Sequence, residues 1–427
     1  MKKKHFSYYL KISFIVIVVF LIVYVTYASI ENIFFTKNNW NKSSNLETKN
    51  ASSTASTSTD LSLNNSTTST VFHLKTPETV RGVYVSSWVI GTASVRDKFY
   101  KTFEGTNLNA VLIDVKDSSG VVSFDIKDPK LKSEAIIENR IRNIDEVIEY
   151  FHKKNIYVIA RIAVFQDPGA AKKYPERAVK SKKTGGLWKD NKGLTWTDAG
   201  NKDQWKYTVD VATYAYSIGF DEVNFDYIRF PSDGNLKDMS FPNSEGQDKV
   251  KVVSSFFSYI GEAMRAKNIP TSADIFGQTT SDDTGMGIGQ TLQAALRSFD
   301  YVSPMSYPSH YVKNFYGITN PDANPYDTIH FSYKDAMTRI DLMAKEESST
   351  ETKVGTTTSV TIDEVKYKAQ KDLYTKKLRP FLQDFTIHFT YGKKEIQDQI
   401  RALNELGIKS FLMWNPSSRY IKEAYTN

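Results

Sequence analysis

One stretch of the chain indicates both its fold and its chemistry: Gly219-Phe220-Asp221-Glu222-Val223-Asn224-Phe225-Asp226-Tyr227-Ile228-Arg229-Phe230-Pro231. The glycine is typical of a helix end, the alternation that follows is typical of a strand, and the proline ends it. Residues two apart share one face of a strand, so Asn224, Asp226 and Ile228 are expected to point the same way. A buried carboxylate without a partner is costly. Asp226 is therefore either a core acid paired with Arg161 or Arg229, or a functional acid.

Similar strands recur from Thr79 onward, alternating with helical patterns. The eight candidates are Val80–Trp88, Ala110–Asp117, Tyr157–Phe165, Glu222–Phe230, Thr271–Gly277, Tyr301–Pro308, Arg379–Phe385 and Ser410–Pro416. Most are continuous apolar runs, as expected for strands covered on both faces. Amphipathic helices are predicted over Asn143–Lys154, Asp248–Lys267 and Lys393–Leu406.

Eight strands with helical crossovers predict an α/β fold, a (β/α)₈ TIM barrel with long rim loops. A doubly wound open sheet is the alternative, but no Gly-rich phosphate loop follows the first strand. Residues 347–377 are expected to form an insertion between the sixth helix and the seventh strand. Only about ten residues follow Pro416, so the eighth helix of the barrel should be short or missing.

The amino-terminal segment, residues 1–35, predicts a transmembrane anchor. Lys2, Lys3 and Lys4 precede the apolar run Ile12–Ala28, which approaches the roughly 20 residues that cross a bilayer. These lysines favour a cytoplasmic amino terminus and an extracytoplasmic folded domain at the cell membrane. A signal peptide cleaved after Ala28 is the alternative. Residues 36–76, rich in Ser, Thr and Asn, predict a disordered linker, which leaves residues 77–427 as the folded domain.

Composition excludes several classes of function. The chain has no cysteine, and its six histidines offer no pair with metal-ligand spacing, so we expect no metal and no cofactor. The net charge is +7, but residues 1–75 contain eight lysines against three acids, which leaves only +2 for the remainder. A nucleic-acid partner would need cations clustered on the folded domain, so none is expected. The sequence does not indicate an oligomeric state.

Polar residues collect at the ends of the predicted strands, where barrel enzymes have their active sites. In strand order they are Trp88; Asp114, Lys116 and Asp117; Arg161; Asp226 and Arg229; Asp274; Tyr307; Gln383 and Asp384; and Trp414 and Asn415. A purely structural core would not gather acids on strands two, four, five and seven. Asp117 and Asp384 are the acids for which a capping or salt-bridge role is the strongest alternative.

Aromatic residues form a second pattern at the same rim. Trp188, Trp196 and Trp205 lie in or near a long insertion, Gln166–Asp203, and Trp88 and Trp414 end two strands. Tyr307, His310, Tyr311 and Tyr316, expected to be exposed, follow the sixth strand. Flat rings suit the apolar faces of sugars, although each tryptophan could instead pack a loop. Together they predict a carbohydrate cleft.

The chain resembles a bacterial family of domains of unknown function that is described as a glycoside hydrolase family. The matching segments are Arg81-Gly82-Val83-Tyr84, Leu112-Ile113-Asp114-Val115-Lys116-Asp117, Phe225-Asp226-Tyr227-Ile228-Arg229-Phe230-Pro231, Ala273-Asp274-Ile275-Phe276-Gly277, Asn320-Pro321-Asp322-Ala323-Asn324-Pro325-Tyr326, Pro380-Phe381-Leu382-Gln383-Asp384-Phe385 and Met413-Trp414-Asn415. The resemblance implies a TIM barrel with a glycosidase-like site. It places Asp226 at the nucleophile position, Asp274 where related barrels usually have a glutamic acid, and Asp384 or Gln383 where a group steadies the transition state.

Glycosidic bond hydrolysis needs one carboxylic acid and one carboxylate, about 5–5.5 Å apart in retaining enzymes. Neighbouring parallel strands lie about 4.8 Å apart, so acids that end strands four and five can reach that separation. We therefore predict a retaining hydrolase of cell-envelope or extracellular polysaccharide, with Asp226 as nucleophile and Asp274 as acid/base. Substrate contacts are expected from Trp88, Asp114, Lys116, Arg161, Arg229, Tyr307, Gln383, Trp414 and Asn415. A non-catalytic glycan-binding barrel is the alternative, in which the acids are structural and buried against Arg161 or Arg229.

Overall fold

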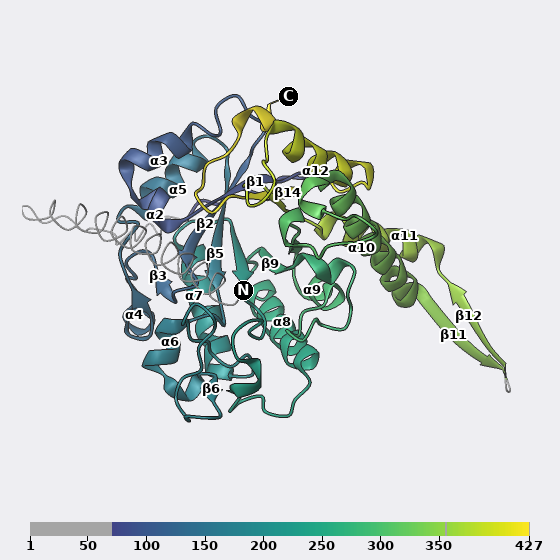
Figure 1. Ribbon diagram of the computed structural model, residues 1–427, viewed down its shortest axis with the longest axis horizontal. Coiled ribbons are helices and arrows are strands. Elements are labelled where there is room, and N and C mark those ends of the chain that lie inside the picture. Colours follow the sequence, from purple (N-terminus) through teal and green to yellow (C-terminus); the bar gives the residue numbers. More distant parts are fainter. Residues whose placement is uncertain (1–70, 355–356, 427) are drawn as a thin grey trace, which may run out of the picture. The chain divides into compact units, whose positions relative to one another are not determined.

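Eight parallel strands close into a barrel in the computed structural model, which describes residues 71–354 and 357–426 (Figure 1). The strands are β1 (Arg81–Val85), β2 (Ala110–Lys116), β5 (Tyr157–Ala163), β7 (Glu222–Asp226), β9 (Thr271–Phe276), β10 (Tyr301–Met305), β13 (Phe381–Gln383) and β14 (Phe411–Trp414). Each pairs with the next in this order, and β14 pairs with β1, so the eight strands form a closed ring. All eight predicted strands are confirmed, each shorter than expected. The predicted anchor and residues 36–70 of the predicted linker lie outside the described residues.

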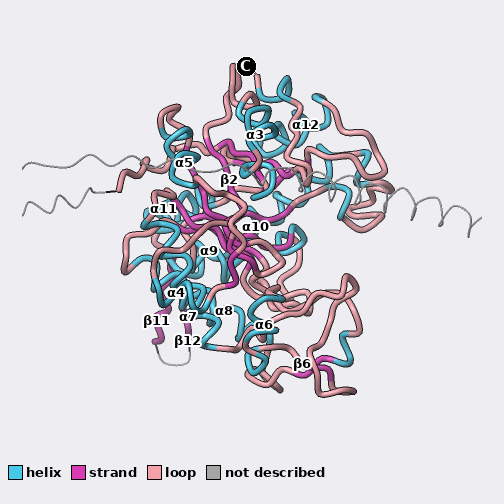
Figure 2. The backbone as a smooth tube through the Cα atoms, turned by 90° about the vertical axis from the view of Figure 1, so that its left-hand side faces the viewer, coloured by secondary structure: helices cyan, strands magenta, loops and turns pink. Residues whose placement is uncertain are grey.

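Helices follow the strands around the barrel, with the strands at the centre in Figure 2. They are α2 (Ser87–Gly91), α3 (Ala93–Tyr100), α4 (Pro129–Glu134), α5 (Ile144–His152), α6 (Pro168–Lys173), α7 (Lys202–Ser217), α8 (Lys249–Arg265), α9 (Leu292–Ser298), α10 (Pro325–Ser348), α11 (Glu364–Lys377) and α12 (Lys393–Glu405). The three predicted amphipathic helices correspond to α5, α8 and α12. Their apolar faces pack on the outward side chains of the strands in one large buried cluster, which includes Val111, Phe225 and Phe256.

Short elements extend the loops. They are β3 (Val121–Val122), β4 (Ile136–Ile137), β6 (Lys180–Ser181), β8 (Met239–Ser240) and the 3₁₀ helices Pro175–Arg177, Leu236–Asp238, Gly277–Thr280, Pro308–His310, Pro321–Ala323 and Lys422–Tyr425. The expected insertion at residues 347–377 is present as an antiparallel hairpin, β11 (Ser349–Val354) with β12 (Thr357–Ile362), followed by α11. After β14 the described chain contains only the last of these 3₁₀ helices, so the eighth barrel helix is missing, as predicted.

Strand β7 turns a polar face to the barrel interior. Glu222 meets the buried Arg379 at 2.8 Å, and Asn224 donates hydrogen bonds to Ser272 and to an aspartate on β9. The expectation that Ile228 shares this face is wrong. The strand ends at Asp226, because the next residue, Tyr227, has a left-handed backbone with φ of 54°. Ile228 consequently joins the outer cluster that contains Phe225.

The folded part begins before the expected boundary at residue 77. The ring of His73 stacks on Tyr216 with centroids 4.0 Å apart, and the amide N–H of Leu74 donates to Asp221 at 2.7 Å. Thr76 forms a hydrogen bond of 2.9 Å with Tyr157, the first residue of β5. These contacts fix the segment against the amino-terminal ends of the strands. Within the described chain, no helix has both the length and the apolar character needed to cross a membrane.

Candidate active site

A cavity of about 460 Å³ opens at the carboxyl-terminal ends of the barrel strands. Six of the twelve predicted site residues line it: Arg161, Asp226, Arg229, Asp274, Tyr307 and Trp414. They come from β5, β7, β9, β14 and the loops after β7 and β10. Half of the residues proposed for the site therefore line this cavity.

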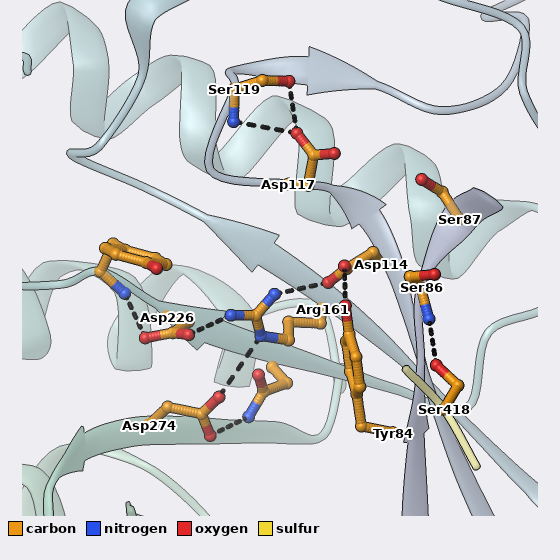
Figure 3. Close-up of polar contacts among 12 residues, drawn as sticks. Tyr84, Ser86, Ser87, Asp114, Asp117, Ser119, Arg161, Asp226, Asp274 and Ser418 are labelled. Carbon is orange, nitrogen blue, oxygen red and sulfur yellow. Dashed lines mark hydrogen bonds and ion pairs between the residues drawn. The ribbon is translucent and has the colours of Figure 1, made fainter. Parts of the chain in front are cut away.

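Arg161 is the centre of the site (Figure 3). Its Nη1 donates to Asp114 Oδ1 at 2.5 Å, its Nη2 donates to Asp226 Oδ2, and its Nε lies 3.7 Å from Asp274 Oδ2. The four residues stand on β2, β5, β7 and β9, which are consecutive neighbours in the barrel. One guanidinium thus joins three carboxyl groups, each almost fully buried.

The two acids proposed for catalysis lie on paired strands. The β7–β9 register aligns Asn224 with Ser272 and Phe225 with Ala273, and continuing it by one residue sets Asp226 beside Asp274. Asp226 Oδ1 also accepts from the N–H of Tyr227 at 2.5 Å. Asp274 Oδ1 accepts from Asn224 at 2.8 Å, whereas its Oδ2 accepts no hydrogen bond from the described chain. Asp274 therefore keeps one buried oxygen, beside Arg161, that accepts no hydrogen bond within the described chain.

Electrostatics distinguish these acids. Burial, followed by the charge of Asp226, raises the pKa of Asp274 well above its usual value. Burial also raises the pKa of Asp114, although Arg161 and Tyr84 oppose it. Burial would lower the pKa of Arg161, but the surrounding carboxylates raise it well above normal. The site thus combines a fixed cation with Asp274, a carboxyl group that favours its protonated form.

Tyr84 was missing from the predicted site, although its motif was among the matching segments. Its hydroxyl donates to Asp114 Oδ2 at 2.5 Å, and its ring stacks on Trp414 with centroids 3.9 Å apart. The guanidinium carbon of Arg161 lies 5.6 Å and 5.1 Å from the centroids of these two rings. Asp114 does not line the cavity, so it acts on the site by positioning Arg161 together with Tyr84.

Three of the predicted substrate contacts do not line the cavity: Lys116, Trp88 and Gln383. Lys116 is buried, pairs with Asp167 at 2.8 Å and donates to a backbone carbonyl. Trp88 does not end β1 but lies on α2, exposed, with Arg140 4.5 Å from its ring. Gln383 is fully buried and accepts from the N–H of Ser309 at 3.1 Å.

Asp384 and Asn415 also lie away from the cavity wall. Asp384 Oδ2 accepts from the hydroxyl of Tyr425 at 2.6 Å and from the N–H of Ile421 at 3.2 Å. Asn415 Nδ2 donates to the carbonyl of Asp384 and to that of Arg419. Both residues fasten the carboxyl-terminal segment, so the capping alternative holds for Asp384. Asp117 forms a salt bridge with Arg140, which agrees with the salt-bridge alternative.

The expected rim of five tryptophans is wrong, because only Trp414 lines the cavity among the tryptophans of the described chain. Trp188, Trp196 and Trp205 are buried, and their indole N–H groups donate to Asn235, Asp190 and Ala199. They pack the long insertion onto the barrel. After the sixth strand, Tyr307 and Tyr311 line the cavity but are buried rather than exposed, His310 lines it from an exposed position, and Tyr316 points elsewhere to Asp335.

Several other residues that line the cavity were not predicted from the sequence. Phe276 and Met305 are apolar residues that end β9 and β10, and Phe381 begins β13; their only signal is their place near proposed residues. Lys192 reaches the cavity from the long insertion, whose contribution to the rim was expected in general terms. Within residues 71–354 and 357–426, no group of three His, Asp or Glu side chains is arranged to hold a metal ion.

Comparison with solved structures finds proteins of similar fold. The glycoside hydrolase domain of PgaB (BpsB) from Bordetella bronchiseptica is similar in structure, with a TM-score of 0.53 at 13% identity over 80% of this chain and 95% of its own. A class V chitinase from Pseudomonas fluorescens Pf-5 has a TM-score of 0.44 at 12% identity, over 81% of this chain and 97% of its own. At these identities, the likeness to PgaB shows the fold alone.

A hypothetical protein from Ruminiclostridium thermocellum ATCC 27405 is 37% identical over 45% of this chain and 96% of its own, with a TM-score of 0.41. No curated protein matches the chain. Residues 82–350 and 344–420 match the family described as "Putative glycosyl hydrolase domain", which covers nearly all of the barrel. The chain therefore belongs to this family of glycosyl hydrolase domains.

Proposed function

We propose that this glycoside hydrolase cleaves a cell-envelope or extracellular polysaccharide by a retaining mechanism, with Asp226 as nucleophile and Asp274 as acid/base. One observation carries the proposal. Asp226 and Asp274 lie on paired strands, line the same cavity and share Arg161, while burial favours the protonated form of Asp274. A carboxylic acid beside a carboxylate is the pair that glycoside hydrolysis requires.

The proposed reaction begins with Asp274 as a carboxylic acid and Asp226 as a carboxylate. The Asp274 carboxyl group gives its proton to the glycosidic oxygen as the Asp226 carboxylate attacks the anomeric carbon, forming a glycosyl ester and releasing the leaving sugar. Asp274, now a carboxylate, takes a proton from water, whose oxygen attacks the same carbon and frees Asp226. We assign this proton transfer to Asp274 Oδ2, because that oxygen accepts no hydrogen bond in the described chain.

Arg161 and the aromatic residues have supporting roles. The guanidinium of Arg161 fixes Asp226, and donates from its other end to Asp114. The rings of Tyr307 and Trp414 line the cavity and offer flat surfaces to a sugar. Asp384 has no role in this mechanism, because its carboxyl group is hydrogen-bonded to Tyr425 and does not line the cavity.

The test is release of reducing sugar from a panel of bacterial envelope polysaccharides and exopolysaccharides. We expect Asp226→Asn and Asp274→Asn to lower turnover on the order of 10⁴-fold, as loss of an essential catalytic group does. Asp117→Asn is the matched control, because Asp117 pairs with Arg140 outside the cavity and its variant should keep wild-type rates. Full activity of Asp226→Asn would refute the nucleophile. NMR of the first product tests stereochemistry, and an inverted anomer would refute retention.

A glycan-binding barrel without catalysis is the second candidate. It is favoured by the contact of both acids with Arg161, the arrangement expected of a structural pair. In that case the wild-type chain would bind a glycan of the panel without cleaving it. Asp226→Asn would then lower stability, because it breaks a buried ion pair, rather than abolish a reaction.

We also propose that residues 1–35 hold the protein at the cell membrane, with the barrel outside the cytoplasm. Support comes from the three lysines that precede the apolar run Ile12–Ala28. In intact cells, added protease should digest the barrel, and deletion of residues 2–35 should leave the barrel protected in the cytoplasmic fraction. A barrel that is protected in intact cells carrying the full chain would contradict this location.

A further inference from the structure

Arg229 is a buried cation in the wall of the cavity. The residue is 8% exposed and lines the cavity. Its Nη1 donates to the carbonyl of Phe230 at 3.0 Å and to Ser232 Oγ at 3.2 Å. Among the described residues, no carboxylate lies at ion-pair distance from it, in contrast to Arg161 and Arg379 in the same barrel. A buried charge normally has such a partner, because its desolvation is costly.

Aromatic rings hold this guanidinium in place. Its central carbon lies 4.7 Å from the ring centroid of Phe276, 4.9 Å from that of Trp196 and 5.5 Å from that of Tyr227. Trp196 is itself fixed by a hydrogen bond to Asp190. Burial lowers the pKa of Arg229, yet a guanidinium stays protonated at neutral pH. The fold thus holds the charged guanidinium of Arg229 at the wall of the cavity in a fixed orientation.

The nearby acids form their direct contacts with groups other than Arg229. Asp226 is paired with Arg161, Asp233 accepts from the N–H of Asn191, and Asp190 accepts from Trp196 and from two backbone N–H groups. Lys192 lines the same cavity and likewise has no carboxylate at ion-pair distance in the part of the chain that the structure describes. Arg161 contacts three carboxyl groups directly, whereas the two remaining lining cations, Arg229 and Lys192, have no such direct contact within the described chain.

We propose that the glycan entering this cavity is acidic and that Arg229 binds its acidic group, a sugar carboxylate or phosphate. The Nε and Nη2 of Arg229 donate no hydrogen bond within the described chain. These two nitrogens present parallel N–H groups along one edge of the guanidinium, the fork that receives two oxygens of a carboxylate or phosphate. Lys192 would add a second, exposed positive charge. The inference names the substrate class of the proposed hydrolase site and rests on that function.

Matched pairs of oligosaccharides test this inference. One set contains uronic acid oligosaccharides and their carboxyl-reduced neutral forms, and the other contains phosphate-bearing oligosaccharides and their dephosphorylated forms. Binding is measured by calorimetry on the full chain carrying Asp226→Asn, which blocks turnover. We expect the acidic member of one pair to bind about tenfold or more tightly than its neutral form, as a charged hydrogen bond implies. The pair whose acidic and neutral members differ in affinity shows whether Arg229 binds a carboxylate or a phosphate.

Variants of Arg229 assign the difference to this residue. Added to the Asp226→Asn chain, Arg229→Gln should weaken the acidic ligand about tenfold and leave the neutral one unchanged. Arg229→Lys keeps the positive charge but lacks the two parallel N–H groups, so it should bind the acidic ligand more weakly than Arg229 and more tightly than Arg229→Gln. If Arg229→Gln does not fold, Arg229→Lys is the variant that is compared with the parent chain. Arg177→Gln is the matched control, because this guanidinium is similarly buried but pairs with Glu134 and does not line the cavity.

The outcomes separate this inference from the proposed function. Equal binding of acidic and neutral forms, or equal weakening of both by Arg229→Gln, would overturn it. Hydrolysis of a neutral glycan by the otherwise wild-type chain, unaffected by Arg229→Gln, would also overturn it and leave the hydrolase intact. Charge-selective binding that depends on Arg229, without release of reducing sugar, would support it and refute the hydrolase.

Discussion

Arg161 determines which of three neighbouring aspartates holds a proton. Three ionised carboxylates around one guanidinium would leave two uncompensated negative charges in a buried site, which is unfavourable at low dielectric. Arg161 donates hydrogen bonds to Asp114 and Asp226 but lies 3.7 Å from Asp274. Asp274 has the weakest of the three contacts with the cation, so protonation there removes one charge at the least cost.

The pH dependence of hydrolysis should therefore report Asp274. Its pKa is raised well above 3.8 by burial and by Asp226, so the acid form persists at pH values where an exposed aspartate is ionised. Because the first step needs that proton, kcat/KM should fall as the pH rises through this raised pKa. Asn224→Ala removes a hydrogen bond that favours the charged form and should move the fall to higher pH. A pH–rate profile in which Asn224→Ala leaves the alkaline limb unchanged would contradict the assignment of Asp274.

At the scale of elements, the strands were predictable and their ends were not. Apolar runs reveal a strand covered on both faces, which is why all eight were found. The ends depend on backbone turns without a sequence signal of comparable strength. Tyr227 takes a left-handed conformation and ends β7 early, and Ser86 caps α2 by accepting from the N–H of Val89, which removes Trp88 from β1. The last residue of a strand is where a side chain enters or leaves a site, so these errors fell on proposed site residues.

Site residues differ in how far the sequence revealed them. The place of Asp226 and Asp274 at the cavity could be predicted, because both acids stand at the carboxyl ends of neighbouring strands, and their catalytic roles stay a prediction. The tryptophans of the insertion could not be assigned, because a ring that packs a loop and one that receives a sugar have the same residue type and similar positions. Trp196 shows that the distinction has limits, since it is buried yet supports Arg229 at the cavity wall.

Asp384 connects β13 to the carboxyl-terminal segment and should make stability depend on pH. Burial raises its pKa to about 7 in the folded chain from 3.8, despite hydrogen bonds from Tyr425 and Ile421. Between these values the folded state binds a proton that the unfolded state lacks. The resulting stabilisation is fully present below pH 3.8 and is lost as the pH rises to about 7, at up to about 1.4 kcal/mol per pH unit.

Urea unfolding of wild type and Asp384→Asn at pH 5 and pH 8 measures this contribution. The wild-type free energy of unfolding should fall by more between the two values than that of Asp384→Asn, because the amide does not titrate and can still accept from Tyr425. The same fall in both proteins would show that Asp384 does not retain its proton on folding. Activity at pH 5 should be similar in both, since Asp384 does not line the cavity.

At the scale of the folded part, both ends of the described chain lie at the face opposite the cavity. Thr76 meets Tyr157 at the start of β5, and Leu74 meets Asp221 just before β7, so the chain enters at the amino-terminal ends of the strands. The carbonyl of Tyr425 accepts from the N–H of Asn107 at 2.8 Å, just before β2, so the chain leaves from the same end. The cavity opens at the carboxyl-terminal ends. A barrel attached through either end therefore presents its site away from the attachment.

Attachment at either end should consequently leave the reaction unimpaired. A fluorescent protein placed after Asn427, or in place of residues 1–35, should change kcat/KM for a soluble oligosaccharide by less than about twofold, because the fused mass lies opposite the mouth of the cavity. The same protein inserted after Lys192, which lines the cavity, should lower hydrolysis of long polysaccharide far more than that of short oligosaccharide. Initial rates on a short and a long substrate measure both effects. Terminal fusions that impair long-chain hydrolysis as strongly as the insertion after Lys192 would show that the polysaccharide also occupies the amino-terminal face of the barrel.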